Sequence, residues 1–314
     1  MTDHRLPLDD PSIFANVFGF MGLPLSRQLD DERNGAVIMG VPYDLGTSGR
    51  SGARFGPLAM RRASANLAWE VQRWPWNFKL SERLAAIDYG DVQFLFGDSE
   101  DMLARVAEQA GRIAAAGKTL ITLGGDHFVS LPLLRAHAGV YGKLALIHFD
   151  AHTDTYNDEE KYNHGCMFYR APRDGLIDPA HSIQVGIRTE YDAPTHEFAV
   201  LDAQRVNDQS AAATVAAIRS RVGSQPAYLS FDIDCLDPAC APGTGTPVVG
   251  GLSTSRALQI LQGIADLDIV GFDVMEVAPA YDHADITALA GATLALQFLY
   301  MRASRLGSAC ASPP

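Results

Sequence analysis

Short apolar runs alternate with longer helix-like segments along most of this chain. The runs are bounded by glycine or polar residues, as buried strands are. They occupy residues 36–41, 119–123, 144–149, 183–187, 227–231 and 269–274. Segments that predict helices lie between them, at residues 100–116, 211–222 and 255–265. The alternation predicts an α/β fold, with a mainly parallel sheet covered by helices on both faces.

The same pattern of strands and helices shows no boundary between domains. No linker rich in proline, glycine or serine interrupts it, and 314 residues suit one large domain over residues 1–314. The apolar stretch at residues 289–301 is interrupted by Gln297 and is too short to span a bilayer, so it predicts a buried terminal helix. Residues 305–314 are expected to form a disordered tail.

Acidic and histidine side chains follow two of the predicted strands. Asp150, His152 and Asp154 alternate after one strand, and Asp232 and Asp234 alternate after another. Alternate side chains of an extended chain point the same way, and ligands of parallel sheets gather at the carboxyl ends of the strands. Two carboxylates about 4 Å apart repel by roughly 4 kcal/mol at an effective dielectric near 20. Bound metal ions are the simplest explanation for such a cluster.

A sixth ligand candidate is His127. It follows a predicted strand and a Gly124-Gly125 pair that permits a tight turn. Two imidazoles and four aspartates can hold two metal ions if two of the aspartates bridge. Oxygen-rich sites with some imidazole suit manganese, whereas zinc prefers tetrahedral sulfur and nitrogen ligands. We expect two Mn²⁺ ions per subunit, with Fe²⁺, Co²⁺ and Zn²⁺ as alternatives.

Composition limits the classes of partner. A formal net charge of −12 argues against binding to nucleic acid or to an anionic membrane surface. The charge is compatible with a cationic substrate, although solubility alone explains it. The four cysteines form no CxxC pair and the N-terminal residues contain no apolar leader core, so a cytoplasmic location is expected. Cys235 is expected to point away from the metals as a small apolar filler.

The metal-ligand segments resemble the signature blocks of the ureohydrolases, the arginase and agmatinase family. The resemblance extends from the Pro11 region to Ser304, and other blocks are similar to those of bacterial agmatinases. These blocks lie at residues 40–43, 47–50, 66–70, 186–189, 242–247 and 273–279. The resemblance implies a three-layer arginase-like fold and a homo-oligomer, either a trimer or a hexamer.

The resemblance also implies a reaction. In the family, metal-bound hydroxide attacks the guanidinium carbon, and the departing amine takes up a proton. The aspartate matching Asp154 is placed to move that proton, and the histidine matching His164 acts as a shuttle or general acid. The glutamate matching Glu276 holds the guanidinium group, whose fork geometry suits a carboxylate. With agmatine the products are putrescine and urea, a step of polyamine biosynthesis.

The choice of substrate depends on the residues around Tyr156. Arginases usually carry an asparagine at this position, where it helps to recognise the amino-acid end of arginine, and this chain has a tyrosine instead. The loop at residues 157–161 is acidic. An acidic rim suits the tail amine of agmatine, although a run of charge is usually only a solvated loop. Agmatine, a small cationic guanidino compound, is the expected substrate.

Other interpretations remain open. A guanidinobutyrase or another guanidino-acid hydrolase needs a cation for the substrate carboxylate, and Arg50 and Arg188 are candidates. A deacetylase of the single-zinc type uses fewer ligands, and the presence of His127 and Asp154 argues against it. An inactive binding protein on the same fold would have lost a ligand or His164, and the sequence retains them all.

The glycine-rich segment at residues 46–52 precedes a helix expected to begin near Pro57. It lacks the P-loop pattern of a phosphate-binding site. We expect a structured loop or a subunit contact there.

Overall fold

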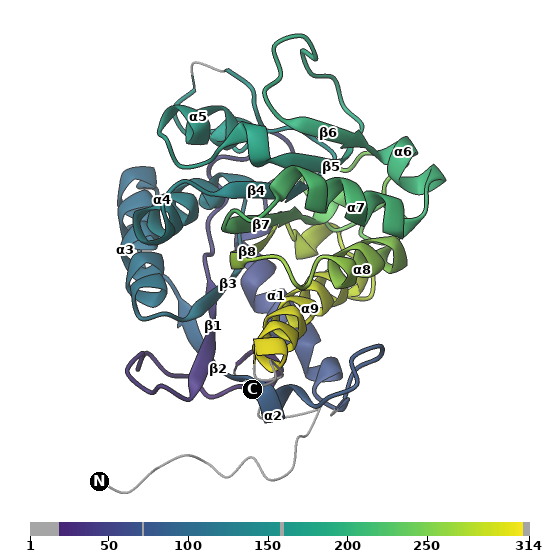
Figure 1. Ribbon diagram of the computed structural model, residues 1–314. Helices are drawn as coiled ribbons and strands as arrows, with labels where there is room; N and C mark the ends of the chain where they lie inside the picture. Colours follow the sequence, from purple (N-terminus) through teal and green to yellow (C-terminus); the bar gives the residue numbers. More distant parts are fainter. Residues whose placement is uncertain (1–18, 71, 158–159, 310–314) are drawn as a thin grey trace, which may run out of the picture.

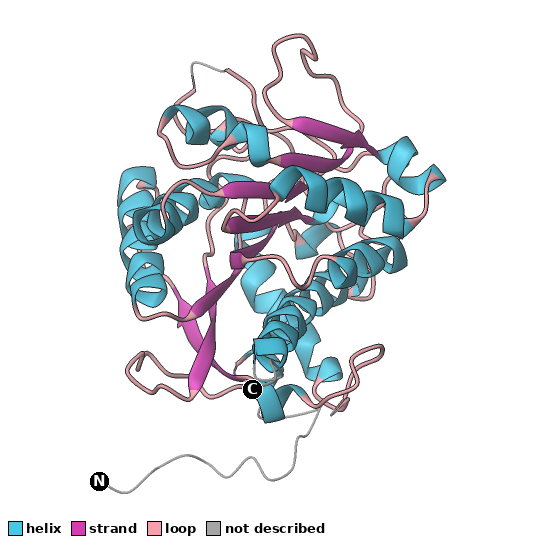
Figure 2. Ribbon diagram, viewed as in Figure 1, coloured by secondary structure: helices cyan, strands magenta, loops and turns pink. Residues whose placement is uncertain are grey.

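A single parallel sheet organises the protein. The computed structural model describes residues 19–309 except 71 and 158–159, and it shows helices on both faces of the sheet (Figures 1 and 2). The strands are β1 (Asn34–Gly40), β2 (Ala85–Asp91), β3 (Thr119–Leu123), β4 (Ala145–Phe149), β5 (Ile183–Ile187), β6 (Ala199–Asp202), β7 (Ala227–Asp232) and β8 (Ile269–Met275). Their order is β2-β1-β3-β8-β7-β4-β5-β6, and every neighbouring pair is parallel.

Several of the helices begin where a side chain satisfies a free backbone N–H group. The side chains of Asp98, Ser210 and Ser253 accept from the backbone N–H three residues later and so cap three of the expected helices. The helices are α1 (Gly56–Ser64), α2 (Leu80–Arg83), α3 (Ser99–Ala115), α4 (Ser130–Tyr141), α5 (Met167–Arg173), α6 (Ala203–Asp208), α7 (Ala211–Val222), α8 (Thr254–Gly263) and α9 (Ile286–Ala309).

Two hydrophobic cores lie on opposite faces of the sheet, because alternate side chains of each strand point in opposite directions. On β1, Ala36 and Ile38 join the core formed with α1, α7, α8 and α9. Val37 and Met39 join the core formed with α3, α4 and α5. Figure 1 shows α3 and α4 on one side of the sheet and α8 and α9 on the other. The predicted three-layer arrangement is confirmed.

All six predicted strands are present, and their observed ends differ by no more than two residues from those expected. The two strands that the sequence did not predict, β2 and β6, are the edges of the sheet. Cys235 is buried in the core, as expected for an apolar filler, although it lies in a short 3-10 turn after β7.

The C-terminal segment differs from the expectation of a disordered tail over residues 305–314. Helix α9 continues to Ala309, because Leu306 still packs against the hydrophobic core. Residues 310–314 lie outside the described part of the chain. Within the described part, only the Ile286–Leu306 stretch of α9 is long and apolar enough to cross a membrane, and 78% of its most apolar window is buried in the protein, as in a core helix.

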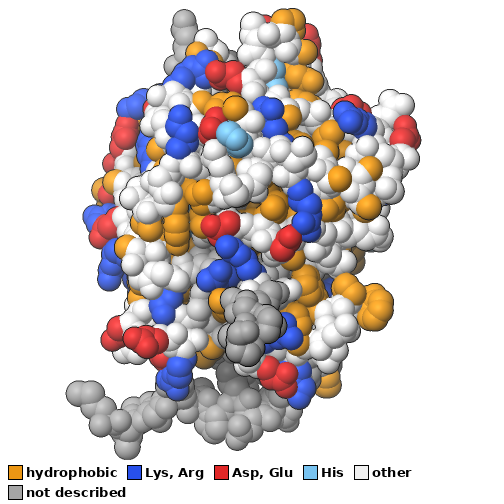
Figure 3. Space-filling view, viewed as in Figure 1, with side chains coloured by type: hydrophobic (Ala, Val, Ile, Leu, Met, Phe, Trp, Pro, Cys, Tyr) orange, Lys and Arg blue, Asp and Glu red, His pale blue; other side chains and the backbone are white. Residues whose placement is uncertain are grey.

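Charged side chains are distributed over the surface. Figure 3 shows lysine and arginine interspersed with aspartate and glutamate on one face of the molecule. The net charge of −12 therefore does not gather into one acidic patch on that face.

Candidate active site

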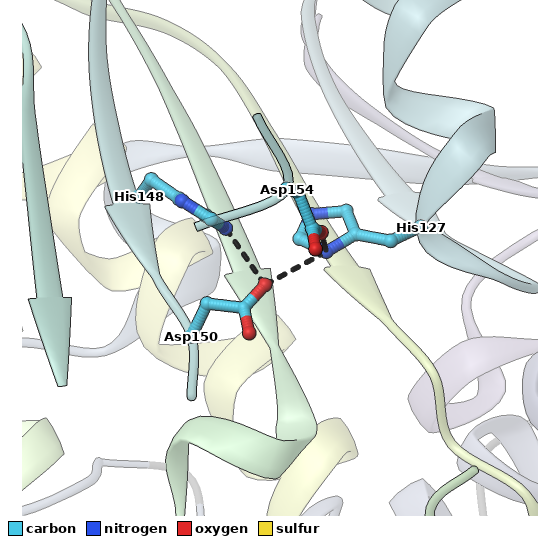
Figure 4. Close-up of side chains that lie close together, drawn as sticks. All are labelled: His127, His148, Asp150 and Asp154. Atoms are coloured by element: carbon cyan, nitrogen blue, oxygen red, sulfur yellow. Dashed lines mark hydrogen bonds and ion pairs between the residues drawn. The ribbon is translucent and has the colours of Figure 1, made fainter. Parts of the chain in front are cut away.

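Three predicted carboxylates surround one nitrogen of His127. This histidine begins the short turn after β3. Its Nδ1 lies 3.1 Å from an oxygen of each of three residues, Asp150, Asp154 and Asp232 (Figure 4 draws the first two). All four side chains are buried. One nitrogen and three oxygens thus lie within reach of a single cation.

A second group lies on the other side of Asp150. His152 Nδ1 is 3.1 Å from Asp234 Oδ2 and 3.3 Å from Asp150 Oδ1. Asp150 therefore faces the first group with Oδ2 and the second with Oδ1, as a carboxylate that bridges two cations does. Asp232 approaches His127 with Oδ2, while its Oδ1 accepts the Asp234 N–H at 2.8 Å. The structure brings all six predicted ligands together.

The electrostatics of these groups fit cation binding. Burial, and after it the charge of neighbouring carboxylates, raises the pKa of Asp154, Asp232 and Asp234 above the ordinary range. Burial lowers the pKa of His152, but its hydrogen bonds to Asp150 and Asp234 outweigh this and raise the pKa to about 12. Cations stabilise buried carboxylates that repel one another. A donor set of imidazole and carboxylate without thiolate suits divalent ions such as manganese.

A buried hydrogen-bond chain fixes the orientation of the His127 ring. His127 Nε2 lies 2.8 Å from Ser230 Oγ, and this hydroxyl donates to Asp273 Oδ1 at 2.7 Å. Asp273 also accepts from Ser130 and Tyr228. Because Ser230 gives its own proton to Asp273, His127 donates its Nε2–H and keeps the Nδ1 lone pair for the carboxylate side. Sequence reasoning missed this chain, although Ser230 and Asp273 were visible as polar residues inside apolar strands.

His148 is a further buried histidine that sequence reasoning missed. It is the penultimate residue of β4, and its Nε2 lies 2.8 Å from Asp150 Oδ2 (Figure 4). The signal was present, because His148 continues the alternation of Asp150, His152 and Asp154 backwards by one step.

Glu276 and His164 form a pair beside the carboxylate cluster. Glu276 follows β8, and its Oε1 accepts the backbone N–H of His127 at 2.9 Å and lies 2.7 Å from His164 Nδ1. Glu276 Oε2 is buried and has no hydrogen-bond partner among the described residues. Burial lowers the pKa of His164, but the hydrogen bond and charge of Glu276 outweigh it and raise the pKa to about 9. A buried acceptor without a donor is costly, so Oε2 is suited to a ligand that brings N–H groups.

Two of these residues have unusual backbone conformations. Asp154 has φ 49° and Glu276 has φ 64°, in the left-handed region that residues with a side chain rarely adopt. Strain of this kind concentrates at functional sites, where surrounding contacts hold it. The backbone conformations of Asp154 and Glu276 are consistent with residues whose side chains must point into the site.

The glycine-rich segment at residues 46–52 forms a structured loop over His164. Ser48 donates its backbone N–H to His164 Nε2 at 3.1 Å, and its hydroxyl lies 2.7 Å from the same atom. The loop is fixed at Gly46, whose N–H donates to buried Asp126 at 2.6 Å, and at Gly52, whose N–H donates to Asp44 at 2.8 Å. Its role at the site is a contact with His164 that the sequence did not indicate.

The rim around Tyr156 is acidic. Tyr156 is 37% exposed and borders an open hollow of about 720 Å³ that Glu190 and Asp192 also line. In the acidic segment 157–161, Glu160 accepts from Asn163 and Lys161 pairs with Glu100, while residues 158–159 lie outside the described part of the chain.

Arg188, one of the two cations considered for a carboxylate-bearing substrate, is used within the fold. It donates to backbone carbonyl oxygens of Asp234 at 2.6 Å and of Val248 at 2.7 Å. Arg188 therefore joins the segments that contain Asp234 and Val248. The other candidate, Arg50, is exposed and lies over the ring of Tyr281.

Comparison with known proteins agrees with this geometry. The family model described as the arginase family matches residues 34–301. A curated agmatinase of Neisseria meningitidis serogroup A is 59% identical over 296 residues, covering 94% of this chain and 96% of the relative. A crystal structure of a hypothetical agmatinase from Burkholderia thailandensis has a TM-score of 0.90 and 49% identity, with 94% of each chain covered. Proclavaminate amidino hydrolase from Streptomyces clavuligerus has a TM-score of 0.87 and 36% identity, covering 94% of this chain and 99% of the other. The chain belongs to the arginase family.

Proposed function

We propose that this protein is an agmatinase-type ureohydrolase, which hydrolyses agmatine to putrescine and urea. The observation that carries the proposal is the buried Oε2 of Glu276, which has no donor among the described residues. The other oxygen of this carboxylate accepts the backbone N–H of His127, one of the six metal-ligand candidates that lie together. A guanidinium group offers several N–H donors to such an oxygen. The high identity to the Neisseria agmatinase supports agmatine as the substrate.

The proposed ligands of two Mn²⁺ ions are the six residues predicted from the sequence. They are His127, Asp150, His152, Asp154, Asp232 and Asp234. When bound, such ions lower the pKa of a shared water, so that hydroxide is available near neutral pH.

The remaining proposed roles belong to groups with defined hydrogen bonds. Glu276 orients the guanidinium group through Oε2, and its Oε1 holds His164 at Nδ1. His164, with its raised pKa, gives a proton to the departing amine, and Asp154 moves the proton within the site. A single domain, a cytoplasmic location, a role in polyamine biosynthesis and a trimeric or hexameric assembly complete the proposal.

Selectivity tests the choice of substrate. We place the substrate tail in the hollow beside Tyr156, where the carboxylates of Glu190 and Asp192 would favour an amine over a carboxylate. Arg188 is already bonded to backbone carbonyls. A poorly paired charge costs about 1–3 kcal/mol, or roughly tenfold to a hundredfold in efficiency. We expect kcat/KM for agmatine to exceed that for arginine and for 4-guanidinobutyrate at least tenfold.

The measurement is urea release by the Mn²⁺-loaded protein, with agmatine, arginine, 4-guanidinobutyrate and 3-guanidinopropionate assayed in parallel. Equal or faster turnover of 4-guanidinobutyrate would reassign the protein to the guanidino-acid hydrolases. No urea from any of the four would remove the proposed activity.

A further inference from the structure

Both oxygens of Asp150 accept a hydrogen bond from a fixed position. The backbone N–H of His152 donates to Oδ1 at 2.6 Å, on the side of the second ligand group. His148 Nε2 lies 2.8 Å from Oδ2, on the side of the first group. The plane of this carboxylate, which faces both groups, is thus set by one backbone donor and one side chain.

The hydrogen-bond partners of Gln184 determine which nitrogen of His148 carries the proton. The side-chain Nε2 of Gln184 donates to the carbonyl oxygen of Thr153 at 2.6 Å, and the same nitrogen lies 3.0 Å from His148 Nδ1. An amide nitrogen only donates, so His148 Nδ1 must accept. The His148 proton therefore sits on Nε2 and points at Asp150.

The remaining atom of the Gln184 amide is consistent with this assignment. Gln184 Oε1 lies 2.7 Å from His196 Nε2, which donates to it. The side-chain amide of Gln184 cannot be flipped, because its oxygen would then face the carbonyl oxygen of Thr153, and neither atom can donate a hydrogen bond. In the hydrogen-bond chain Asp150–His148–Gln184–His196, every contact therefore joins one donor and one acceptor.

Packing leaves the His148 ring no other position. The ring is fully buried, and its centroid is 4.4 Å from that of Phe168 and 5.2 Å from that of His127. In Figure 4 it points at Asp150 from the side opposite His127. A buried ring held at both nitrogens and packed against an aromatic face has the properties of a positioning group.

We propose that His148, held by Gln184, is a positioning residue that orients Asp150 to bridge two cations, and that it is not itself a ligand. The inference rests on the metal-binding role proposed above for Asp150. It adds a residue that acts on the site only through that carboxylate. His148 lies close enough to His127, Asp150 and Asp154 to be mistaken for a ligand, but a nitrogen that carries a proton has no lone pair for a metal.

The test measures metal binding, with turnover as a second readout. Mn²⁺ is titrated into metal-free protein in competition with a chelating dye, and Co²⁺ is titrated with its visible absorption recorded. The variants are His148→Phe, which keeps an aromatic ring without a donor, and His148→Gln, which returns an amide donor. Gln184→Met leaves His148 in place but removes its support. His181→Ala, which changes a partly exposed histidine bonded to Asp178, is the control.

The expected result is an affinity for Mn²⁺ that is roughly 10–100-fold weaker in His148→Phe, the usual effect of losing such a partner. Two ions still bind at saturation, and the Co²⁺ spectrum keeps its shape. His148→Gln recovers part of the affinity, Gln184→Met loses affinity in the same direction, and the control matches the wild type. At saturating metal, KM for agmatine stays within about twofold, because the buried ring does not face the substrate.

Two results would overturn the proposal. Unchanged affinity in both His148→Phe and Gln184→Met would show that Asp150 needs no such support. One ion per chain at saturation in His148→Phe would make His148 a ligand. Absence of metal binding by the wild type would instead refute the proposed metal site itself, so the two failures are distinguishable.

Discussion

His164 has both ring nitrogens engaged by residues far away in the sequence. Nδ1 faces Glu276, and Nε2 accepts from the N–H of Ser48, so in the neutral ring the proton lies on Nδ1. Glu276 also holds the turn of His127 through its backbone N–H. The carboxylate of Glu276 therefore holds both His164, which carries the proton, and the turn of His127, which is a proposed metal ligand. His164 itself supplies none of the proposed ligand atoms.

This separation gives a prediction for His164→Ala. The variant should lose roughly 10²–10⁴-fold in kcat, the usual range for a general acid. It should still bind two metal ions, because the His164 ring is hydrogen-bonded to Ser48 and Glu276, neither of which is among the six proposed ligands. Metal content by elemental analysis and turnover of agmatine check both parts. Loss of metal would make His164 a ligand.

His137 gives a prediction about acid stability that is independent of the site. The ring is buried, Nδ1 lies 2.8 Å from the carbonyl oxygen of Leu133, and Nε2 has no partner among the described residues. Burial lowers its pKa to about 4. Since the unfolded pKa is about 6.5, the unfolded chain binds the proton more readily. This contribution to stability is present above pH 6.5 and is lost as the pH falls towards 4, by at most about 3 kcal/mol.

The matched variant is His137→Asn, which can keep a donor near Leu133 and does not titrate. Between pH 6.5 and pH 4.5, urea unfolding of metal-free protein should show a smaller loss of stability for the variant than for the wild type. Groups common to both proteins cancel in the difference. Parallel curves for the two proteins would remove His137 as a cause.

At the scale of elements, the turn after β3 depends on close backbone approach. A Cβ added at Gly125 would lie 1.7 Å from the carbonyl oxygen of Tyr43, and one at Gly124 would lie 1.8 Å from the sulfur of Met275. The turn places His127 directly beyond the strand. The glycine pair is therefore needed for packing as well as for bending the chain.

Gly125→Ala should accordingly lower both the melting temperature and the affinity for Mn²⁺, since Tyr43 or the turn must move. Gly111→Ala is the control. Gly111 lies inside α3, where an added Cβ would meet no described atom within 4 Å beyond its chain neighbours and the backbone of its own helix. Alanine should stabilise the helix by about 0.5–1 kcal/mol. Similar melting curves for the two variants would contradict the close approach.

The central strands were predictable and the edge strands were not, for physical reasons. A strand buried on both faces must be apolar throughout, which leaves a clear run in the sequence. β2 instead contains Asp88, which is fully buried but paired with Arg61, a contact that no local pattern reveals. β6 has only four residues, and Leu201 alone among them is buried.

The residues of the site were likewise predictable in part. Alternation at two strand ends, together with the glycine turn after a third strand, was sufficient to predict that the six ligand candidates would lie together. Ser48, Ser230 and Gln184 act through hydrogen bonds that join segments more than 30 residues apart. Such partners depend on tertiary packing, and their residue types are common throughout the chain.

On the scale of the whole molecule, the six proposed ligands lie at the ends of β3, β7 and β4, and Glu276 follows β8. These four strands are neighbours in the order β3-β8-β7-β4. These strands are dispersed along the sequence from residue 119 to residue 275. The cluster therefore exists only when the centre of the sheet is assembled, and an unfolded chain has no equivalent site.

Four buried carboxylates at the centre of the sheet make divalent cations a thermodynamic part of the native state. A ligand that binds only the folded chain adds about 2.7 kcal/mol of stability at a hundred times its Kd. Chelation with EDTA should lower the melting temperature, and added Mn²⁺ should raise it in proportion to the logarithm of its concentration. A melting temperature that changes with neither EDTA nor Mn²⁺ would show that the folded protein does not bind the ion. If the ion stabilises the folded chain as expected, its supply in the cell governs how much folded protein survives proteolysis, as well as how fast each molecule works.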